Sequence, residues 1–263
     1  MECLQNSSVQ VKNLSVDFKT SHGLVHAVKD VNIQISKGKI HALVGESGSG
    51  KSVTSLAIMN LLANNGKVTG GEILLGEKDL LKMSRKERNK YMGNTFGMIF
   101  QDPTASLDPL FTVGDLMTEG LIEKGKMTKK EARELAIESL KAVNLANPEY
   151  LMSKRPFELS GGMCQRVMIA IVMSMRPEFL IADEPTTALD VTVQKQILEQ
   201  IYEICHEKNI GILFITHDLG VVAEIADEVS IMQDGVIVES GTVEEIFYHA
   251  KHEYTKRLLD AVL

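Results

Sequence analysis

The sequence predicts an α/β protein with a mostly parallel central sheet, an antiparallel β lobe and an inserted helical subdomain. Three observations lead to this prediction. Short apolar runs alternate with longer helical patterns, as in a parallel sheet covered by helices. A segment near the N-terminus alternates polar and apolar residues and contains no long helix. Strand signals then disappear over residues 102–177, where helix signals accumulate.

Three apolar runs are expected to form the buried central strands, over residues 40–44, 179–182 and 211–215. Each is followed by a polar, cap-like cluster and then by a helical pattern, which is typical of strands in a parallel sheet. The alternation over residues 9–35 predicts antiparallel strands, and residues 70–76 predict one more. These last two segments would make the antiparallel β lobe.

The helical region is expected to be an insertion within one domain. Its clearest signal is a capping box at residues 128–131, which opens a helical run to Leu145. The sequence has no internal repeat, low-complexity tract or Gly/Ser linker that would mark a tethered module. The predicted organisation is one domain over 1–263, with a helical insertion at 102–177 and a C-terminal helical tail at 240–263.

The composition predicts a globular protein of a reducing, cytosolic compartment. Of the 263 residues, 44% are hydrophobic and 24% are charged, close to globular averages. The net charge of −7 opposes a general attraction to nucleic acid or to an anionic membrane surface. The three cysteines, Cys3, Cys164 and Cys205, form no CxxC pair, so neither a disulfide scaffold nor a zinc site is expected. The sequence begins without a secretory signal, and no apolar run approaches the ~20 residues that cross a membrane.

A locally basic segment occupies residues 82–90 (KMSRKERNK). We expect a solvated helix face there, because runs of charge are usually hydrated. Contact with a partner protein is the alternative.

A phosphate-binding loop is predicted where the first central strand ends. The pattern G-x-x-x-x-G-K-[ST] stands between that strand and a helical run from Lys51 to Leu62, as this motif requires. Its residues are Gly45, Glu46, Ser47, Gly48, Ser49, Gly50, Lys51 and Ser52. Glycines let backbone N–H groups converge on phosphates, and the helix N-terminus adds partial positive charge. Lys51 would reach the β- and γ-phosphate oxygens, and the Ser52 hydroxyl would bind Mg²⁺.

Two carboxylates and one aromatic ring extend this hypothesis. Asp183 and Glu184 directly follow a central strand, where an aspartate can hold the metal and a glutamate can activate water. A helix cap is the alternative for this acidic pair. No N-K-x-D motif for reading guanine is present, which favours adenine, and Phe18 is a candidate to stack on it. An ordinary core position is the alternative for Phe18.

The segment at residues 159–166 (LSGGMCQR) is where the sequence resembles a known family, the ATPase subunits of ABC transporters. The motifs of that family follow one another along nearly the whole chain. They are the P-loop at 45–52, Gln101 in FQDP like the Q-loop, residues 159–163 like the signature, Asp183-Glu184, the run ALD ending at Asp190, and His217.

The resemblance implies that this chain binds ATP and Mg²⁺ and hydrolyses the nucleotide. It assigns Lys51 to the phosphates, and it assigns Ser52, Gln101 and Asp183 to Mg²⁺ or its waters. Glu184 would orient or deprotonate the attacking water.

The resemblance also implies a head-to-tail pair of ATPase subunits, in which the signature of each closes over the nucleotide of the other. Ser160, Gly161 and Gly162 open a helical run and would present a hydroxyl and N–H groups to that nucleotide. By the same resemblance, Asp190 is expected to be one of the nucleotide-binding residues.

His217 would contact the γ-phosphate. The alternative is that His217 only neighbours a helix N-cap formed by Asp218.

A finer resemblance points to the dipeptide/oligopeptide/nickel importer branch, and within it to the first of its two dissimilar ATPase subunits. It is carried by Met163 and by residues 165–170, 182–191 and 254–259. Cys164 departs from the branch pattern, which usually has a basic residue, and Glu253 stands where proline is usual. The end of the sequence at Leu263 resembles, weakly, the shorter nickel or metal-chelate importers.

The predicted function is therefore that of an ATP-hydrolysing subunit, peripheral at the cytoplasmic face of the cell membrane, of an importer for peptides or nickel/metal chelates. The expected partners are a second homologous ATPase, two transmembrane permease subunits and an extracellular substrate-binding protein, with membrane contact through the permease and no nucleic acid. The alternative is a soluble ABC-type ATPase that clamps nucleic acid or a ribosome, and a metabolite kinase comes third. A single P-loop, the absence of sustained heptads and the acidic charge count against that clamp.

Overall fold

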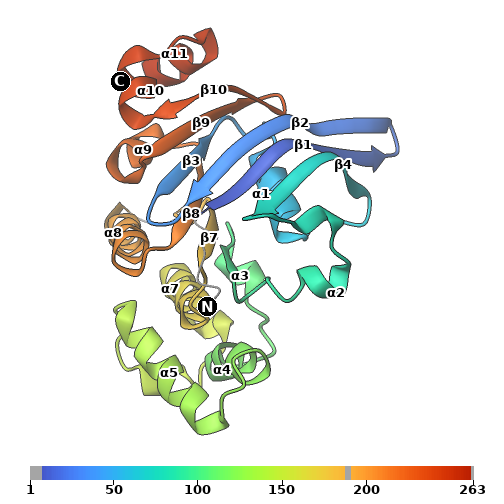
Figure 1. Cartoon of the computed structure of the whole chain (residues 1–263). Helices are drawn as coiled ribbons and strands as arrows, with labels where there is room; N and C mark the ends of the chain where they lie inside the picture. The colour runs from blue at the N-terminus through green and yellow to red at the C-terminus, as the bar shows by residue number, and fades with distance from the viewer. Residues whose placement is uncertain (1–7, 187–190, 262–263) are drawn as a thin grey trace. The chain divides into compact units, whose positions relative to one another are not determined.

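The structure, a computed structural model, describes residues 8–186 and 191–261. The chain divides into two compact units. One comprises Met1–Asn89 and Ile204–Leu263 and is called here the P-loop unit; the other comprises Lys90–Glu203 and is called the helical unit. Both units combine strands and helices (Figure 1).

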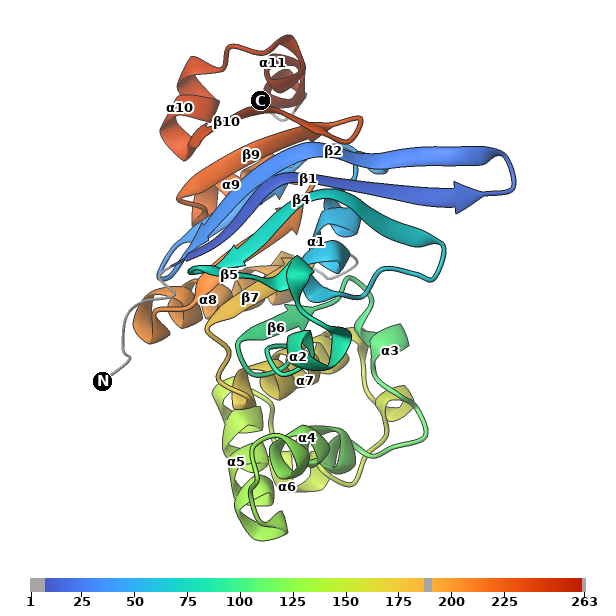
Figure 2. The ribbon, with the colours of Figure 1, turned by 45° about the vertical axis from the view of Figure 1, so that its right-hand side comes forward.

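An antiparallel sheet opens the P-loop unit, in the strand order β2-β1-β4-β5. Its strands are β1 (Ser8–Thr20), β2 (Gly23–Ser36), β4 (Gly66–Leu75) and β5 (Lys78–Asp79). Figure 2 shows β1, β2 and β4 side by side as one layer. The predicted antiparallel lobe is confirmed, although β4 begins at Gly66, earlier than the sequence pattern indicated.

Parallel strands form the second sheet of this unit. The central strand β3 (Ile40–Val44) pairs in parallel with both β8 (Gly211–Thr216) and β9 (Glu228–Gln233), and β10 (Val236–Thr242) runs antiparallel to β9. Every residue of β3 and β8 is buried, which explains their almost continuous apolar sequence. The first and third predicted central strands are thus confirmed.

Short helices complete the P-loop unit. They are α1 (Lys51–Met59), the 3-10 turn η1 (Leu80–Lys82), α2 (Arg85–Arg88), α9 (Leu219–Ile225), α10 (Val243–His249) and α11 (Glu253–Asp260). Helix α1 starts at the predicted residue, but the prediction that it runs to Leu62 was wrong. It ends at Met59 because Asn60 adopts a left-handed conformation, with φ of 60°.

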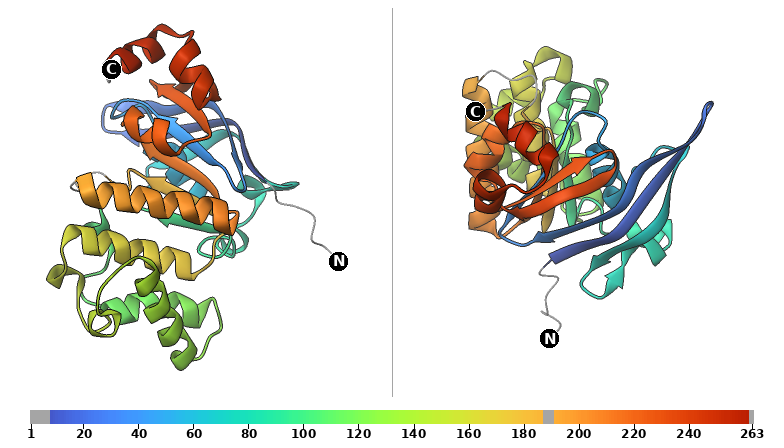
Figure 3. Two further views of the ribbon diagram at one scale, coloured as in Figure 1. Left: turned by 90° about the vertical axis from the view of Figure 1, so that its left-hand side faces the viewer. Right: turned by 90° about the horizontal axis from the view of Figure 1, so that it is seen from above.

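The helical unit contains a parallel strand pair, β6 (Phe96–Ile99) and β7 (Phe179–Asp183), so the second predicted central strand is also confirmed. Its helices are α3 (Pro103–Ser106), α4 (Val113–Glu123), α5 (Lys129–Ala142), α6 (Pro148–Leu151), η2 (Pro156–Glu158), α7 (Gly161–Ser174) and α8 (Val191–Lys208), which continues into the P-loop unit. Helices α4, α5 and α7 pack against one another (Figure 3). None of the described helices is both long and apolar enough to cross a membrane.

The predicted capping box of α5 is confirmed. Thr128 accepts a hydrogen bond from the Glu131 N–H, while the Glu131 carboxylate accepts one from the Thr128 N–H at 2.8 Å. The helix ends at Ala142 and not at the predicted Leu145, since Asn144 has φ of 55° and leaves the helical path.

The basic segment at residues 82–90 is mostly exposed, as expected of a solvated face, and Arg88 is the exception among its basic residues. Arg88 is only 6% exposed, and its guanidinium donates to the carbonyl oxygens of Ala57 at 2.6 Å and Ile58 at 3.0 Å. These carbonyls lie in the last turn of α1, where the usual helical hydrogen bonds run out; Ala57 also accepts from the Asn60 N–H at 3.3 Å. Burial lowers the pKa of Arg88, with Asp79 opposing the shift. Arg88 therefore caps the helix that follows the P-loop.

Candidate functional site

The P-loop joins β3 to α1 and depends on glycine at two positions. A Cβ on Gly45 would lie 2.1 Å from the backbone oxygen of Met232, and a Cβ on Gly50 would lie 2.6 Å from that of Ala27. Gly50 also has φ of 108°, a conformation that other residues rarely adopt. Within the motif Gly45, Ser49, Gly50 and Lys51 are buried, whereas Glu46, Ser47, Gly48 and Ser52 are exposed.

The Lys51 side chain folds back over the loop. Its ammonium donates to the carbonyl oxygens of Gly45 at 2.7 Å and Glu46 at 2.9 Å. Lys51 is also the first residue of α1, so its charge adds to the partial positive charge of that helix terminus. A buried ammonium, a helix N-terminus and exposed loop residues together fit an anion such as a phosphate.

Residues distant in sequence support the back of the loop. The Gly235 N–H, in the turn between β9 and β10, donates to the Ser49 carbonyl at 2.9 Å. The Gly235 carbonyl in turn accepts from the Lys29 N–H at 2.8 Å, and the Lys29 ammonium donates to the Asp234 carbonyl at 3.0 Å. Sequence reasoning missed these residues, and only the turn-forming Asp234-Gly235 pair offered a local signal.

Phe18 and His217 are the two further candidates in the P-loop unit. Phe18 is half-buried on β1, with its ring against Gly66, where a Cβ would lie 2.6 Å from a ring carbon. His217 is exposed between β8 and α9. Asp218 caps α9, as the alternative for this segment required, and its carboxylate accepts from the Gly220 N–H at 2.8 Å. Adenine stacking by Phe18 and phosphate contact by His217 stay predictions.

The helical unit places Gln101 beside Glu184. Asp183 ends β7 and is 6% exposed, and Glu184 follows it with φ of 46°, in the left-handed region. Holding glutamate there costs on the order of 1 kcal/mol, which is typical of functional positions. The Gln101 side-chain amide, just after β6, donates to the Glu184 carboxylate at 2.8 Å. The structure thus brings together an amide and a carboxylate that the sequence placed far apart.

The loop after Gln101 is fixed by Asp102. Its carboxylate caps α3, accepting from the backbone N–H groups of Ala105 at 3.0 Å and Thr104 at 2.9 Å. The bond from Ala105 is the main cause that lowers the pKa of Asp102.

The signature segment begins helix α7, as predicted. Ser160 is its N-cap and accepts from the Met163 N–H at 3.3 Å, while Gly161 is exposed with open space around it. Gly162 is half-buried. Cys164 is buried and its thiol donates to the Pro156 carbonyl at 3.4 Å, and burial raises the pKa of that thiol. This departure from the branch pattern is therefore a packing position. Asp190 lies outside the described residues.

A family model described as ABC transporter matches residues 28–187. The chain belongs to the ABC transporter family. Two curated relatives from Bacillus subtilis (strain 168) are similar over most of the chain. The oligopeptide transport ATP-binding protein OppD is 50% identical over 252 residues, covering 95% of this chain and 70% of that relative. The dipeptide transport ATP-binding protein DppD is 48% identical over 255 residues, covering 97% of this chain and 76% of that relative.

A solved structure supports the fold. It is the dimeric ATP-binding cassette MJ0796 in a post-hydrolysis state bound to ADP and Pi, with a TM-score of 0.80 and 30% identity. The match covers 89% of this chain and 98% of that one. The predicted fold class, an α/β ABC ATPase with parallel strands, an antiparallel lobe and a helical region, is confirmed.

Proposed function

We propose that this chain is the ATP-hydrolysing subunit of a peptide importer and that hydrolysis drives uptake through partner membrane subunits. The observation that carries the proposal is the P-loop, whose Lys51 ammonium sits at the N-terminus of α1 beside exposed loop residues. The relatives OppD and DppD, which are named as peptide transport proteins, support the class of cargo. A nickel or metal chelate remains the alternative cargo.

Nucleotide binding would use the residues of the P-loop unit. Backbone N–H groups of the loop and the Lys51 ammonium would hold the phosphates, and Phe18 would stack on adenine. His217 would contact the γ-phosphate.

The proposed Mg²⁺ ligands are Ser52, Gln101 and Asp183. Their hydroxyl, amide and carboxylate oxygens are the hard ligands that this ion prefers, and Mg²⁺ usually keeps phosphate and water ligands as well. When bound, it would neutralise charge on the transferred phosphoryl group.

Glu184 is proposed to orient or deprotonate the attacking water. Its carboxylate already holds the Gln101 amide at 2.8 Å, so the two side chains constrain one another. A fixed acceptor lowers the cost of orienting water in the transition state. Gln101 would also couple the nucleotide site to the surface that contacts the membrane subunits.

We infer that the chain works as half of a pair with a second homologous ATPase. In that pair Ser160, Gly161, Gly162 and Asp190 would complete the nucleotide site of the partner. Two permease subunits and an extracellular substrate-binding protein would complete the transporter, which would place this chain at the cytoplasmic face of the membrane.

Two variants of the assembled transporter test the proposal. Glu184→Gln should retain ATP binding and lose at least 100-fold in ATP turnover, whereas Lys51→Ala should lose ATP binding itself. Glu134→Gln, an exposed glutamate on α5, is the matched control and should behave as wild type. Unchanged hydrolysis by Glu184→Gln would remove its role toward water, and unchanged affinity in Lys51→Ala would contradict the proposed ATP site.

The cargo is tested by uptake into proteoliposomes that contain the purified complex. ATP-dependent accumulation of a labelled peptide, lost in Glu184→Gln, would support peptide import. Accumulation of ⁶³Ni chelate without peptide uptake would favour the alternative.

A further inference from the structure

The C-terminal helix α11 brings a tyrosine hydroxyl to the P-loop. The Glu46 backbone N–H donates to the Tyr254 hydroxyl oxygen at 3.2 Å, across 208 positions of sequence. We propose that Tyr254 is a positioning residue for nucleotide binding. Its hydroxyl fixes the peptide group whose carbonyl holds the Lys51 ammonium. This inference rests on the proposed role of the P-loop as the ATP site.

The geometry of one peptide group connects Tyr254 to Lys51. The N–H of the Gly45–Glu46 peptide is bound by Tyr254, and the carbonyl of the same peptide accepts from the Lys51 ammonium at 2.7 Å. A peptide group is planar, so its N–H and C=O point in opposite directions and turn together. Fixing the N–H therefore fixes the direction of the carbonyl that holds the lysine.

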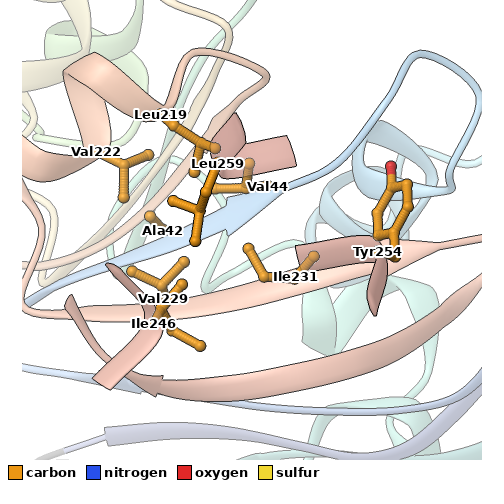
Figure 4. Close-up of a cluster of buried hydrophobic side chains, with 9 residues drawn as sticks. All are labelled: Ala42, Val44, Leu219, Val222, Val229, Ile231, Ile246, Tyr254 and Leu259. Atoms are coloured by element: carbon orange, nitrogen blue, oxygen red, sulfur yellow. The ribbon is translucent and has the colours of Figure 1, made fainter. Parts of the chain in front are cut away.

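Tyr254 is itself held firmly. It is 4% exposed and belongs to an apolar cluster between the β3–β9 sheet and helices α9, α10 and α11 (Figure 4). The other members are Ala42, Val44, Leu219, Val222, Val229, Ile231, Ile246 and Leu259. In Figure 4 the Tyr254 ring stands at one side of the cluster, and its hydroxyl points away from the aliphatic side chains. The ring therefore packs in the apolar cluster, while the hydroxyl contacts the P-loop.

A polar anchor fixes the start of α11. The Glu239 carboxylate, on β10, accepts from the backbone N–H groups of Lys251 at 2.7 Å and His252 at 3.1 Å. His252 then caps the helix by accepting from the Tyr254 N–H at 3.2 Å. Burial raises the pKa of the Tyr254 phenol, so the hydroxyl stays neutral at physiological pH.

The test uses the complete transporter with Tyr254→Phe, which keeps the buried ring and removes only the hydroxyl. Because a single hydrogen bond to the loop is lost, we expect the KM for ATP to rise about five- to tenfold while kcat changes less than twofold. The melting temperature without nucleotide should stay within about 2 °C of wild type. Tyr248→Phe on α10, where the tyrosine is 79% exposed, is the matched control and should leave KM unchanged.

A second variant tests whether the Tyr254 hydroxyl and the Glu46 N–H act through the hydrogen bond that joins them. Glu46→Pro removes the N–H donor without altering Tyr254. In the double variant, KM should rise no further than in the more affected single variant. Additive effects, an unchanged KM in Tyr254→Phe, or a change confined to kcat would each overturn the proposal.

Lys51→Ala separates this inference from the proposed function. If Lys51→Ala abolishes ATP binding while Tyr254→Phe resembles wild type, only the positioning role is wrong. If Lys51→Ala binds ATP normally, the ATP site itself is wrong and the positioning role falls with it.

Discussion

Replacing Arg88 by methionine should destabilise the protein by about 2 kcal/mol, because the guanidinium caps the helix that follows the P-loop. Two hydrogen bonds from a charged donor are worth roughly 1.5–3 kcal/mol each, or about 3–6 kcal/mol together. Removing a buried charge recovers several kcal/mol of desolvation, and the Ala57 carbonyl keeps a bond from the Asn60 N–H at 3.3 Å. Methionine retains most of the apolar stem, so packing changes little.

Urea denaturation and thermal melting of the purified chain measure this effect. For a protein of this size, ~2 kcal/mol corresponds to about 4–8 °C in melting temperature. Arg85→Met is the matched control, since Arg85 is exposed on the same short helix α2. Arg88→Lys should be intermediate, because an ammonium lacks the forked geometry that reaches both carbonyls. Equal stability of Arg88→Met and Arg85→Met would refute the capping role.

Two further predictions concern acid stability and the P-loop. The His41 ring, whose Nδ1 lies 3.4 Å from the Glu228 carboxylate, is the main cause that holds the pKa of Glu228 at about 2 against an ordinary 4.5. The stabilisation from this carboxylate is therefore full above about pH 4.5 and disappears as pH falls toward 2. Glu228→Gln should therefore cost on the order of 1–2 kcal/mol at pH 7, after allowance for solvent screening, and less in acid; a pH-independent difference in urea midpoints would contradict this. Gly45→Ala should lower ATP affinity at least tenfold, because its Cβ would lie 2.1 Å from the Met232 carbonyl. Gly161→Ala is the control, because its Cβ meets open space, and it should leave the melting temperature unchanged or slightly higher. If Gly45→Ala and Gly161→Ala melted at similar temperatures, the P-loop would tolerate a side chain at Gly45.

Local sequence signals were enough to predict the central strands and the start of each functional helix. The apolar run at 40–44 is β3 itself, and the P-loop motif defined where α1 begins. Helix ends were harder to place, although Asn60 and Asn144 carry a signal for them. Both stop a helix by taking a left-handed conformation, which asparagine tolerates better than most residues. Because apolar residues continue the helical pattern past both asparagines, the sequence analysis placed the two helix ends too late.

Contacts between distant segments could not be predicted from local patterns. Arg88 stands in a charged run that is indistinguishable from a hydrated helix face, and its partners lie in another helix. The turn at Gly235 and the hydroxyl of Tyr254 reach the P-loop from the last part of the chain. Such contacts depend on the fold as a whole, since no periodicity or spacing connects the residues that make them. The hydrogen bond between Gln101 and Glu184 belongs to the same class.

The two units differ in the order in which a ribosome can supply their parts. The helical unit, Lys90–Glu203, is one continuous stretch, whereas the P-loop unit is built from both ends of the chain. Its strand β3 pairs with β8 and β9, which are synthesised only after the helical unit is complete. The apolar strand β3 therefore stays without these two partners until the helical unit has been synthesised. Competence to bind ATP thus requires segments that lie on both sides of the helical unit in the sequence.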